Sequence, residues 1–547
     1  MKIRFLIFLL AAIVLAFLLA KHDVTGAGNE TSRYSVVESV LERGTFVIAH
    51  DEEVQVINDG VPETRTRVVN DSFFSTPDKG KRDGRYYGDK PPLLTFGVIA
   101  WGWLLKCFGV RFLRNDYHGA VYLTNVLIFI LSSLTGWFFY VGLRRRKRMP
   151  EGYRVAMSVL SVASTLVLSY SVVLNNHTLC AAAMMGLILL MERCEETGMT
   201  RLRAFLLGIL TGLLFNLEFV TGGVMGVAVF VFVLAAIAPR RIENVLLYAA
   251  GGGLMILLEG GMNMVSYGSP LPLYLSTHKP SFAEKNYLSY AFNILFGFEG
   301  FFLYMPALLF AGFACASKRM RRDRVFATMM ASAAAAMFLF AVGTSDYGGW
   351  CYGYRFLIPF APVLLYYAAI YFGRPRPRLK RWVLFRLALL WGIVFSVVGV
   401  MNPWNYGYDG SPEFKKVLGE DFRNGFLANC FVFFWKASPD SFITMFFMND
   451  VYMPDKSMMY LLTELAVRKD EDGIMRIFRQ SMERKKEMDA EPAAGAGADP
   501  LVPSVPAGQE AALSGTQKKA PQIFQPFDPG SQRPETVRTG DPETRPE

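Results

Sequence analysis

The chain alternates long apolar blocks with short polar connections from its start to about position 402. Each block is close to the ~20 residues that an α-helix needs to cross the hydrocarbon core of a bilayer. The pattern therefore predicts an all-α polytopic membrane protein with about eleven transmembrane helices. We expect these helices at residues 1–20, 119–140, 153–173, 177–191, 203–218, 221–238, 243–262, 290–314, 325–343, 355–373 and 383–401.

The connections between the apolar blocks differ in charge in strict alternation. The intervening loops are rich in Asp, Asn, Tyr, Gly and Trp, whereas Lys and Arg cluster at 144–148, 193–203, 240–241, 318–324 and 374–381. Clustered Lys and Arg mark the cytoplasmic side of a membrane protein. We therefore expect a cytoplasmic N-terminus. The net charge of +10 follows from the same loops, so no nucleic-acid partner is expected.

The pattern divides the chain into three regions. Residues 1–402 are expected to form the transmembrane module, with a long first loop on the non-cytoplasmic side at 21–118. Inside this loop, the apolar stretch 91–109 predicts an interfacial or re-entrant helix that begins at two prolines. Residues 403–490 are expected to be a small helical C-terminal region. Residues 491–547, rich in Ala, Gly, Pro, Gln and Ser, predict a disordered tail.

Polar residues that could carry chemistry gather on the non-cytoplasmic side. Taken singly, each has a structural explanation: a carboxylate in a hydrated loop, a surface histidine, or an aromatic belt at the interface. The six cysteines have no metal-ligand spacing and are expected to be small buried hydrophobes. The ordered set is more informative, and includes Glu30, Arg33, Asp78, Asp89, Lys90, His177, Glu218, Glu259, His278 and Arg355.

Most of these residues, though not His177, Glu218 and Glu259, stand in segments that resemble glycosyltransferase family 39. Residues 29–48 and 76–94 are similar to the first periplasmic loop of that family, and 267–278, 297–309 and 347–362 are similar to later stretches of bacterial members. The most specific pieces are DKPPL and GGWCYGYRFLIP, and the resemblance covers about residues 1–400. It implies a GT-C fold in a bacterial inner membrane, with a periplasmic active site. The family includes protein O-mannosyltransferases and the lipid A aminoarabinose transferase.

The resemblance implies a sugar donor linked to polyprenyl phosphate, and an acceptor hydroxyl that attacks C1 of the sugar. Cations stabilise the departing lipid phosphate, and the implied candidates are Lys90, Arg355 and Arg33. A carboxylate must take the acceptor proton. Where the family has an Asp-Glu pair, this chain has Glu30 followed by Thr31. Glu30 is the expected base.

Further site residues follow from the same resemblance. Asp78 is the second candidate base, and Asp89 fills the acidic position before Lys-Pro-Pro. The substrate pocket is expected to include Tyr86, Tyr87, His177, Trp350 and Tyr352.

A divalent metal ion is the cofactor that the resemblance suggests. Asp89 and His278 could share Zn, Mn or Mg, since oxygen and imidazole ligands suit such ions. The acceptor stays open between a protein, a glycolipid and a glycan, and the sugar between a hexose and a pentose. The expected partners are therefore the lipid-linked donor, the bilayer and one of these acceptors.

Two other classes of membrane protein compete with a transferase. A lipid or oligosaccharide transporter, or a flippase, places ionisable residues mid-span or breaks helices at the midplane. A ligase of O-antigen type would carry a large late loop with its own basic cluster. The charges of this chain gather at one face instead, which favours an interfacial enzyme that takes a lipid donor.

Overall fold

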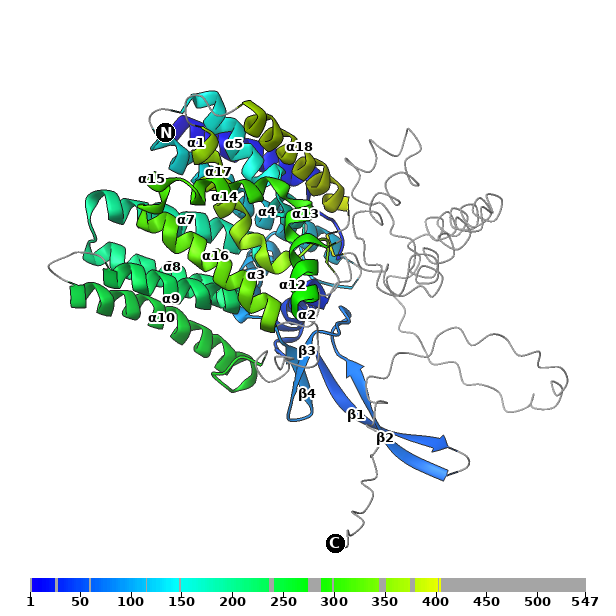
Figure 1. Cartoon of the computed structure of the whole chain (residues 1–547). Coiled ribbons are helices and arrows are strands. Elements are labelled where there is room, and N and C mark those ends of the chain that lie inside the picture. The colour runs from blue at the N-terminus through cyan, green and yellow to red at the C-terminus, as the bar shows by residue number, and fades with distance from the viewer. Residues whose placement is uncertain are drawn as a thin grey trace, which may run out of the picture. The chain divides into compact units, whose positions relative to one another are not determined.

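A computed structural model gives the architecture of the chain (Figure 1). The predicted C-terminal region 403–490, apart from residues 403–404, and the predicted tail 491–547 lie outside the residues that it describes. The structure describes residues 2–24, 28–58, 61–114, 116–146, 149–235, 241–273, 287–297, 300–343, 351–373, 379–401 and 403–404.

Long helices occupy most of the predicted apolar blocks. Among the described residues, seven are long and apolar enough to cross a membrane, or eight if the bent pair Tyr287–Tyr304 and Pro306–Cys315 is one span. The seven are α1 (Lys2–Leu19), α4 (Tyr117–Arg144), α7 (His177–Thr197), α10 (Arg241–Tyr267), α16 (Arg324–Gly343), the pair η2 (Arg355–Phe360) and α17 (Ala361–Phe372), and α18 (Leu379–Met401).

The other predicted blocks form shorter or broken helices. Each expected block contains helix, with breaks such as Thr165 in 153–173 and Met305 in 290–314, and the count of eleven spans stays a prediction. The shorter helices are α5 (Glu151–Ala163), α6 (Leu166–Ser171), α8 (Arg201–Leu217), α9 (Phe219–Ala235), α12 (Tyr287–Phe296), α13 (Phe301–Tyr304), η1 (Pro306–Phe310), α14 (Ala311–Cys315) and α15 (Lys318–Arg321).

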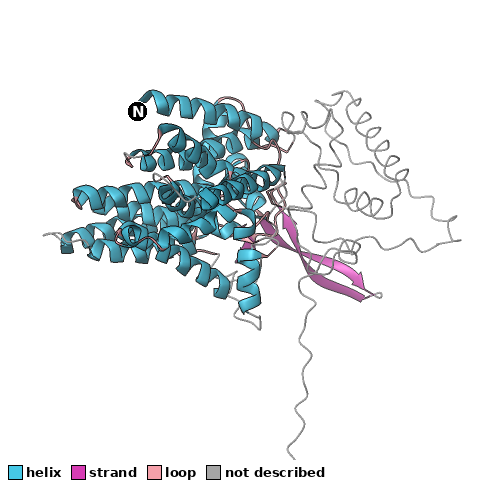
Figure 2. Ribbon diagram, turned by 45° about the horizontal axis from the view of Figure 1, so that its top comes forward, coloured by secondary structure: helices cyan, strands magenta, loops and turns pink. Residues whose placement is uncertain are grey.

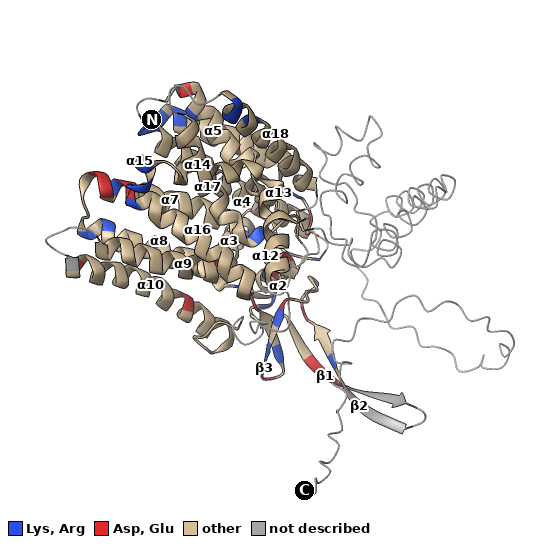
Figure 3. Ribbon diagram, in the orientation of Figure 1, with Lys and Arg blue, Asp and Glu red and all other residues tan. Residues whose placement is uncertain are grey.

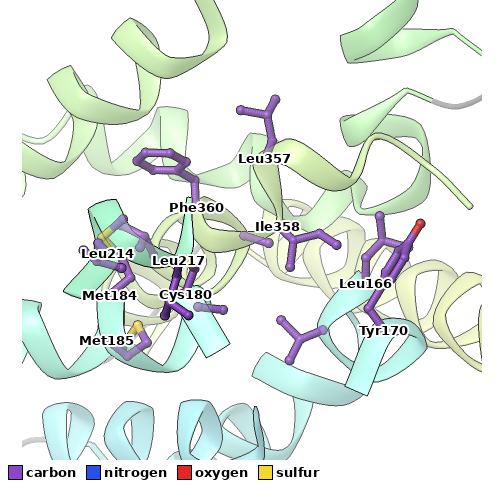
Figure 4. Close-up of a cluster of buried hydrophobic side chains, with 14 of the residues drawn as sticks. Leu166, Tyr170, Cys180, Met184, Met185, Leu214, Leu217, Leu357, Ile358 and Phe360 are labelled. Atoms are coloured by element: carbon purple, nitrogen blue, oxygen red, sulfur yellow. The ribbon is translucent and has the colours of Figure 1, made fainter. Parts of the chain in front are cut away.

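The core of the bundle surrounds α7 and the η2–α17 pair, whose most apolar window is 83% buried. The most apolar window of α7 is 67% buried, whereas those of α1 and α10 are 11% and 22% buried. Apolar side chains on these two outer helices face outward, as they do where a helix contacts lipid. Figure 4 shows the core between α6, α7, α8 and η2, which includes Leu166, Tyr170, Cys180, Met184, Met185, Leu214, Leu217, Leu357, Ile358 and Phe360.

The first loop contains a β-sheet, so the all-α prediction is wrong for this region (Figure 2). The sheet has the order β2-β1-β4-β3 and consists of β1 (Ala49–Asn58), β2 (Val61–Asn70), β3 (Lys79–Arg82) and β4 (Arg85–Gly88). Its pairs are antiparallel, with Ala49 opposite both Asn70 and Tyr86. Asp83 and Gly84 have φ of 50° and 73° in the β3–β4 turn. An Asp-Gly pair at positive φ is typical of a two-residue hairpin.

The basic connections meet at the end of the bundle that holds the C-terminus of α7, which we call the basic end. Arg145 and Arg146 pair with Glu192, and the Arg324 guanidinium donates to the Ala235 carbonyl oxygen, 3.2 Å away. Figure 3 shows Lys and Arg near α15 and the start of α8 at this end. The alternation read from the sequence is therefore an alternation in space. The identity of the cytoplasmic end stays a prediction.

Candidate functional site

The helix α2 (Gly28–Arg43) brings the first-loop candidates into the protein. Glu30 and Arg33 are 0% and 1% exposed, although the helix is polar in composition. The Gly28 carbonyl accepts hydrogen bonds from the hydroxyls of Thr31 and Thr76, at 3.3 and 3.2 Å. A Cβ at Gly28 would lie 2.6 Å from the Asp78 carboxyl carbon. Glycine at this position therefore lets the carboxylate approach the start of α2.

Arg33 ties α2 to the segment that leads into α3 (Pro92–Cys107). Its guanidinium donates to the Pro91 carbonyl oxygen at 3.0 Å, to Thr95 Oγ1 at 3.3 Å and to Asn176 Oδ1 at 3.4 Å. Burial lowers the pKa of Arg33 to about 10, against the opposing effect of nearby carboxylates, Asp89 first. The guanidinium therefore stays charged at neutral pH.

Lys90 lies between two carboxylates just before α3. Its Nζ is 2.8 Å from Asp78 Oδ2 and 3.3 Å from Asp89 Oδ1. The side chains of Lys90 and Asp89 are 12% and 2% exposed, so solvent screens them little. Proline occupies the first turn of α3, as predicted, where a missing N–H costs little. The charged pair is thus fixed where the loop turns into the helix.

A second layer of polar residues supports Arg33 from behind. Glu218 leaves helical geometry between α8 and α9, with φ of −151° and ψ of 106°. Its Oε2 accepts a hydrogen bond from Asn176 Nδ2 at 3.0 Å and lies 3.1 Å from His177 Nδ1. The Asn176 side chain therefore connects Glu218 to Arg33. Glu218 and His177 were candidates from the sequence, whereas no sequence signal pointed to Asn176 as the link between Glu218 and Arg33.

A pocket opens in front of Arg33 and Lys90. These two cations are the charged side chains in its described lining, and the carboxylates of Asp78, Asp89 and Glu218 do not line it. The wall opposite belongs to α10. The pocket is lined by Ser32, Arg33, Val36, Phe46, Tyr87, Gly88, Lys90, Pro92, Thr95, Phe96, Asn263, Ser266 and Tyr267. The α10 residues of this lining, Asn263, Ser266 and Tyr267, are neutral and lie in an apolar helix, so a single sequence gives no signal for them. The exception is Tyr267, which begins one of the segments that resemble the family.

The two tyrosines predicted for the substrate pocket in β4 separate. Tyr87 lines the pocket, whereas the Tyr86 hydroxyl donates to Asp51 Oδ1 in the sheet at 3.0 Å. Successive strand residues point to opposite faces, so only one of the pair can face the pocket.

Two further predicted residues, Tyr352 and Arg355, are not in the described pocket lining. Tyr352 is fully buried, and its hydroxyl donates to the Phe395 carbonyl oxygen at 2.7 Å. Its side chain therefore packs against α18. Arg355 lies over the rings of Phe356 and Trp404, 5.2 and 4.9 Å from their centroids. It is not in the pocket lining. The predicted Trp350 and His278 lie outside the described residues.

The predicted metal ion has one of its two proposed ligands in the described part of the chain. Asp89 is there, paired with Lys90. No group of three or more His, Cys, Asp and Glu side chains in the described ranges could hold a metal ion. The metal site at Asp89 and His278 stays a prediction, and no chemical step below depends on it.

No protein-family model and no curated protein matches the chain. Solved structures are similar to it. ArnT from Cupriavidus metallidurans in the apo state aligns at 13% identity, over 82% of this chain and 77% of ArnT, with a TM-score of 0.45. The same protein bound to undecaprenyl phosphate aligns at 11% identity, over 81% and 77%, with a TM-score of 0.46.

A third similar structure is the archaeal oligosaccharyltransferase AglB from Archaeoglobus fulgidus, in complex with an inhibitory peptide and a dolichol-phosphate. It aligns at 13% identity over 75% of this chain and 58% of AglB, with a TM-score of 0.45.

Proposed function

We propose that the chain is a membrane glycosyltransferase that moves a sugar from a polyprenyl-phosphate carrier to an acceptor hydroxyl on the non-cytoplasmic face. One observation carries the proposal: both charged side chains in the described pocket lining, Arg33 and Lys90, are cations. Phe46 and Phe96 add apolar surface to the same pocket. An anion attached to an apolar chain fits this combination.

The proposed reaction needs charge stabilisation at the leaving phosphate. The acceptor oxygen forms a bond to C1 of the sugar, the bond from C1 to the phosphate oxygen breaks, and the lipid phosphate leaves with the electron pair. Arg33 and Lys90 are placed to hold that phosphate as its charge develops. Asp78 and Asp89 hold the Lys90 ammonium from the side away from the pocket, which fixes the cation before the ligand arrives.

The acceptor proton needs a base, and the site offers two carboxylates. The Asp78 side chain is 29% exposed and paired with Lys90, so an incoming hydroxyl can reach it. Glu30 is fully buried, one turn before Arg33 on α2. Glu30, the base implied by the family resemblance, is therefore less accessible to an incoming hydroxyl in this structure than Asp78.

A transporter or flippase is the competing function. Alternating access requires a path to both ends of the bundle. At the basic end, Glu192 is 4% exposed and is held by Arg145 and Arg146. The cationic pocket lies at the other end of α7, which favours chemistry at one face. The similar structures of ArnT and AglB hold undecaprenyl phosphate and dolichol-phosphate, respectively.

The proposed function is tested by sugar transfer in reconstituted membranes. We expect mass spectrometry to find a glycolipid or glycoprotein that forms only with wild-type protein. Lys90→Ala and Asp89→Asn should each reduce transfer by about a hundredfold or more, because a buried cation at the leaving phosphate is lost or misplaced. Both variants should stay folded.

Lys106→Ala is the matched control for Lys90→Ala. Lys106 lies in α3 and, like Lys90, is partly buried and pairs with a carboxylate, Glu42, at 3.4 Å, but it does not line the pocket. Its loss should leave transfer within about twofold of wild type, because this cation does not face the bound phosphate. Full activity of Lys90→Ala, or an equal loss in Lys106→Ala, would reject the proposed site.

A further inference from the structure

The wall of the pocket that belongs to α10 carries a polar stripe. Glu259, Asn263, Ser266 and Tyr267 follow a spacing of four, three and one residues, which places them on one face of the helix. Other faces carry apolar side chains, such as Leu257 and Val265, which are 75% and 66% exposed. Polar side chains in a membrane helix are costly, so a stripe confined to one face points to a function.

The side-chain hydrogen bonds of the stripe stay local. Asn263 Nδ2 donates to the Pro270 carbonyl oxygen at 3.3 Å, and Ser266 Oγ to the Met262 carbonyl oxygen at 2.8 Å. The Tyr267 hydroxyl donates to the Leu271 carbonyl oxygen at 2.8 Å. These bonds hold the stripe in place from its own helix and the following turn, and they do not reach the wall of Arg33 and Lys90.

Glu259 is the least explained member of the stripe. It is 3% exposed, and neither carboxylate oxygen has a hydrogen-bond partner among the described residues. A buried polar group without such a partner is costly. Its position one turn from Asn263 places this carboxylate beside the pocket wall, where a hydroxyl of a bound ligand would satisfy it.

The two walls of the pocket differ in chemistry. One presents the cations Arg33 and Lys90, and the other presents an amide and a hydroxyl. The Tyr87 and Tyr267 rings connect the walls, with centroids 6.0 Å apart. Phosphate oxygens favour guanidinium and ammonium groups, whereas neutral amides and hydroxyls suit the donors and acceptors of a sugar. In a sugar phosphate the two groups share one oxygen, so they must occupy adjacent surfaces.

We infer that Asn263 and Ser266 of α10, extended by Glu259, bind the hydroxyls of the donor sugar while Arg33 and Lys90 bind the phosphate to which that sugar is attached. This inference rests on the proposed function and assigns the sugar-binding half of the same pocket. Tyr267 contributes the surface of its ring, because its hydroxyl is bonded to the turn after α10. Selection among sugars is thereby separated from binding of the lipid phosphate.

The test compares two kinds of ligand in nanodiscs. The probes are undecaprenyl phosphate alone and undecaprenyl phosphate carrying mannose, glucose or arabinose. We expect at least one sugar-bearing lipid to bind wild type more tightly than the bare phosphate. Asn263→Ala and Ser266→Ala should each weaken that ligand about fivefold to tenfold, the effect of losing one or two hydrogen bonds. Affinity for undecaprenyl phosphate should change less than about twofold.

Val265→Ala is the control, because Val265 lies on the same helix and faces outward. Alanine is a good helix former, and thermal unfolding of each variant checks that α10 is intact. Three outcomes would overturn the sugar assignment alone. The variants could lose affinity equally for both ligands, they could lose affinity for neither, or no sugar-bearing lipid could bind wild type more tightly than the bare phosphate. If wild type does not bind undecaprenyl phosphate, or if Lys90→Ala binds it normally, the proposed function fails as well.

Discussion

The two ends of α7 carry similar sets of residues with different outcomes. At its first residue, His177 lies 3.1 Å from Glu218, which also binds the asparagine that contacts Arg33. Near its last turn, Glu192 lies 2.7 Å from Arg146 and accepts a hydrogen bond from Tyr366 at 2.9 Å. Both clusters are largely or partly buried, and both combine a carboxylate with arginine.

The difference between the ends lies in what the cations face. At the basic end, Arg145 and Arg146 both pair with one carboxylate, Glu192, and neither arginine lines the pocket. At the other end, Arg33 and Lys90 have carboxylates behind them and a pocket in front. Buried ion pairs therefore do not identify a functional site by themselves. The proposed site is assigned instead from a cavity whose charged lining has one sign.

The largest expected contrast between the two ends is their accessibility from outside the cell. In a background without native cysteines, Thr64→Cys in β2 and Arg193→Cys at the basic end place thiols at exposed positions. A membrane-impermeant maleimide should label only Thr64→Cys in intact cells, and both variants after permeabilisation. Labelling of Arg193→Cys alone in intact cells would invert the predicted orientation.

Stability should respond most strongly at the basic end. Glu192→Ala leaves two partly exposed arginines and the buried Tyr366 hydroxyl without their carboxylate, and it should destabilise the protein by about 2–3 kcal/mol. Glu243→Ala is the control at the same end, since that pair with Arg201 is more exposed, and it should cost at most about 1 kcal/mol. Unfolding in detergent measures both. If the Glu192→Ala protein stayed folded but no longer bound undecaprenyl phosphate, the basic end would bind the ligand, which contradicts the proposed site.

A smaller and more specific effect is expected at the first residue of α7. Glu218→Gln keeps the side-chain shape but removes the charge that binds the Asn176 amide. Because Asn176 accepts a hydrogen bond from Arg33, the guanidinium is then held less firmly. Affinity for undecaprenyl phosphate should fall about tenfold. Glu38→Gln serves as the control, because Glu38 pairs with Arg43 on the same helix as Arg33. In an Arg33→Ala background, Glu218→Gln should have little further effect. Additive losses would show that Glu218 does not act through Arg33.

The sequence predicted the parts of the fold that hydropathy controls. Apolar blocks became helices, two prolines began α3, and the basic connections met at one end. The sheet was missed because the alternation of apolar and polar residues between 49 and 70 is weak. The two Asp-Gly pairs of the first loop were the best sequence signal for its hairpins.

The candidate site could be predicted only where its residues are charged. Asp78, Asp89 and Lys90 are close in sequence and meet in space. Asn263 and Ser266 come from a helix more than 150 positions away, and neutral residues in an apolar block give no sign of the wall they will face. The separation of Tyr86 from Tyr87 depended on strand register, which the turn at Asp83 and Gly84 sets.

The most direct test of the cationic pocket is the position of a bound lipid phosphate. Cryo-electron microscopy of the protein in nanodiscs with undecaprenyl phosphate should show the phosphate between Lys90 and Arg33. Its oxygens should lie within about 3 Å of both cations, and the polyprenyl chain should leave past Phe46 or Phe96. A phosphate bound at the basic end beside Arg145 and Arg146, or a pocket that stays free of lipid at saturating ligand, would show that these two cations have a structural role alone.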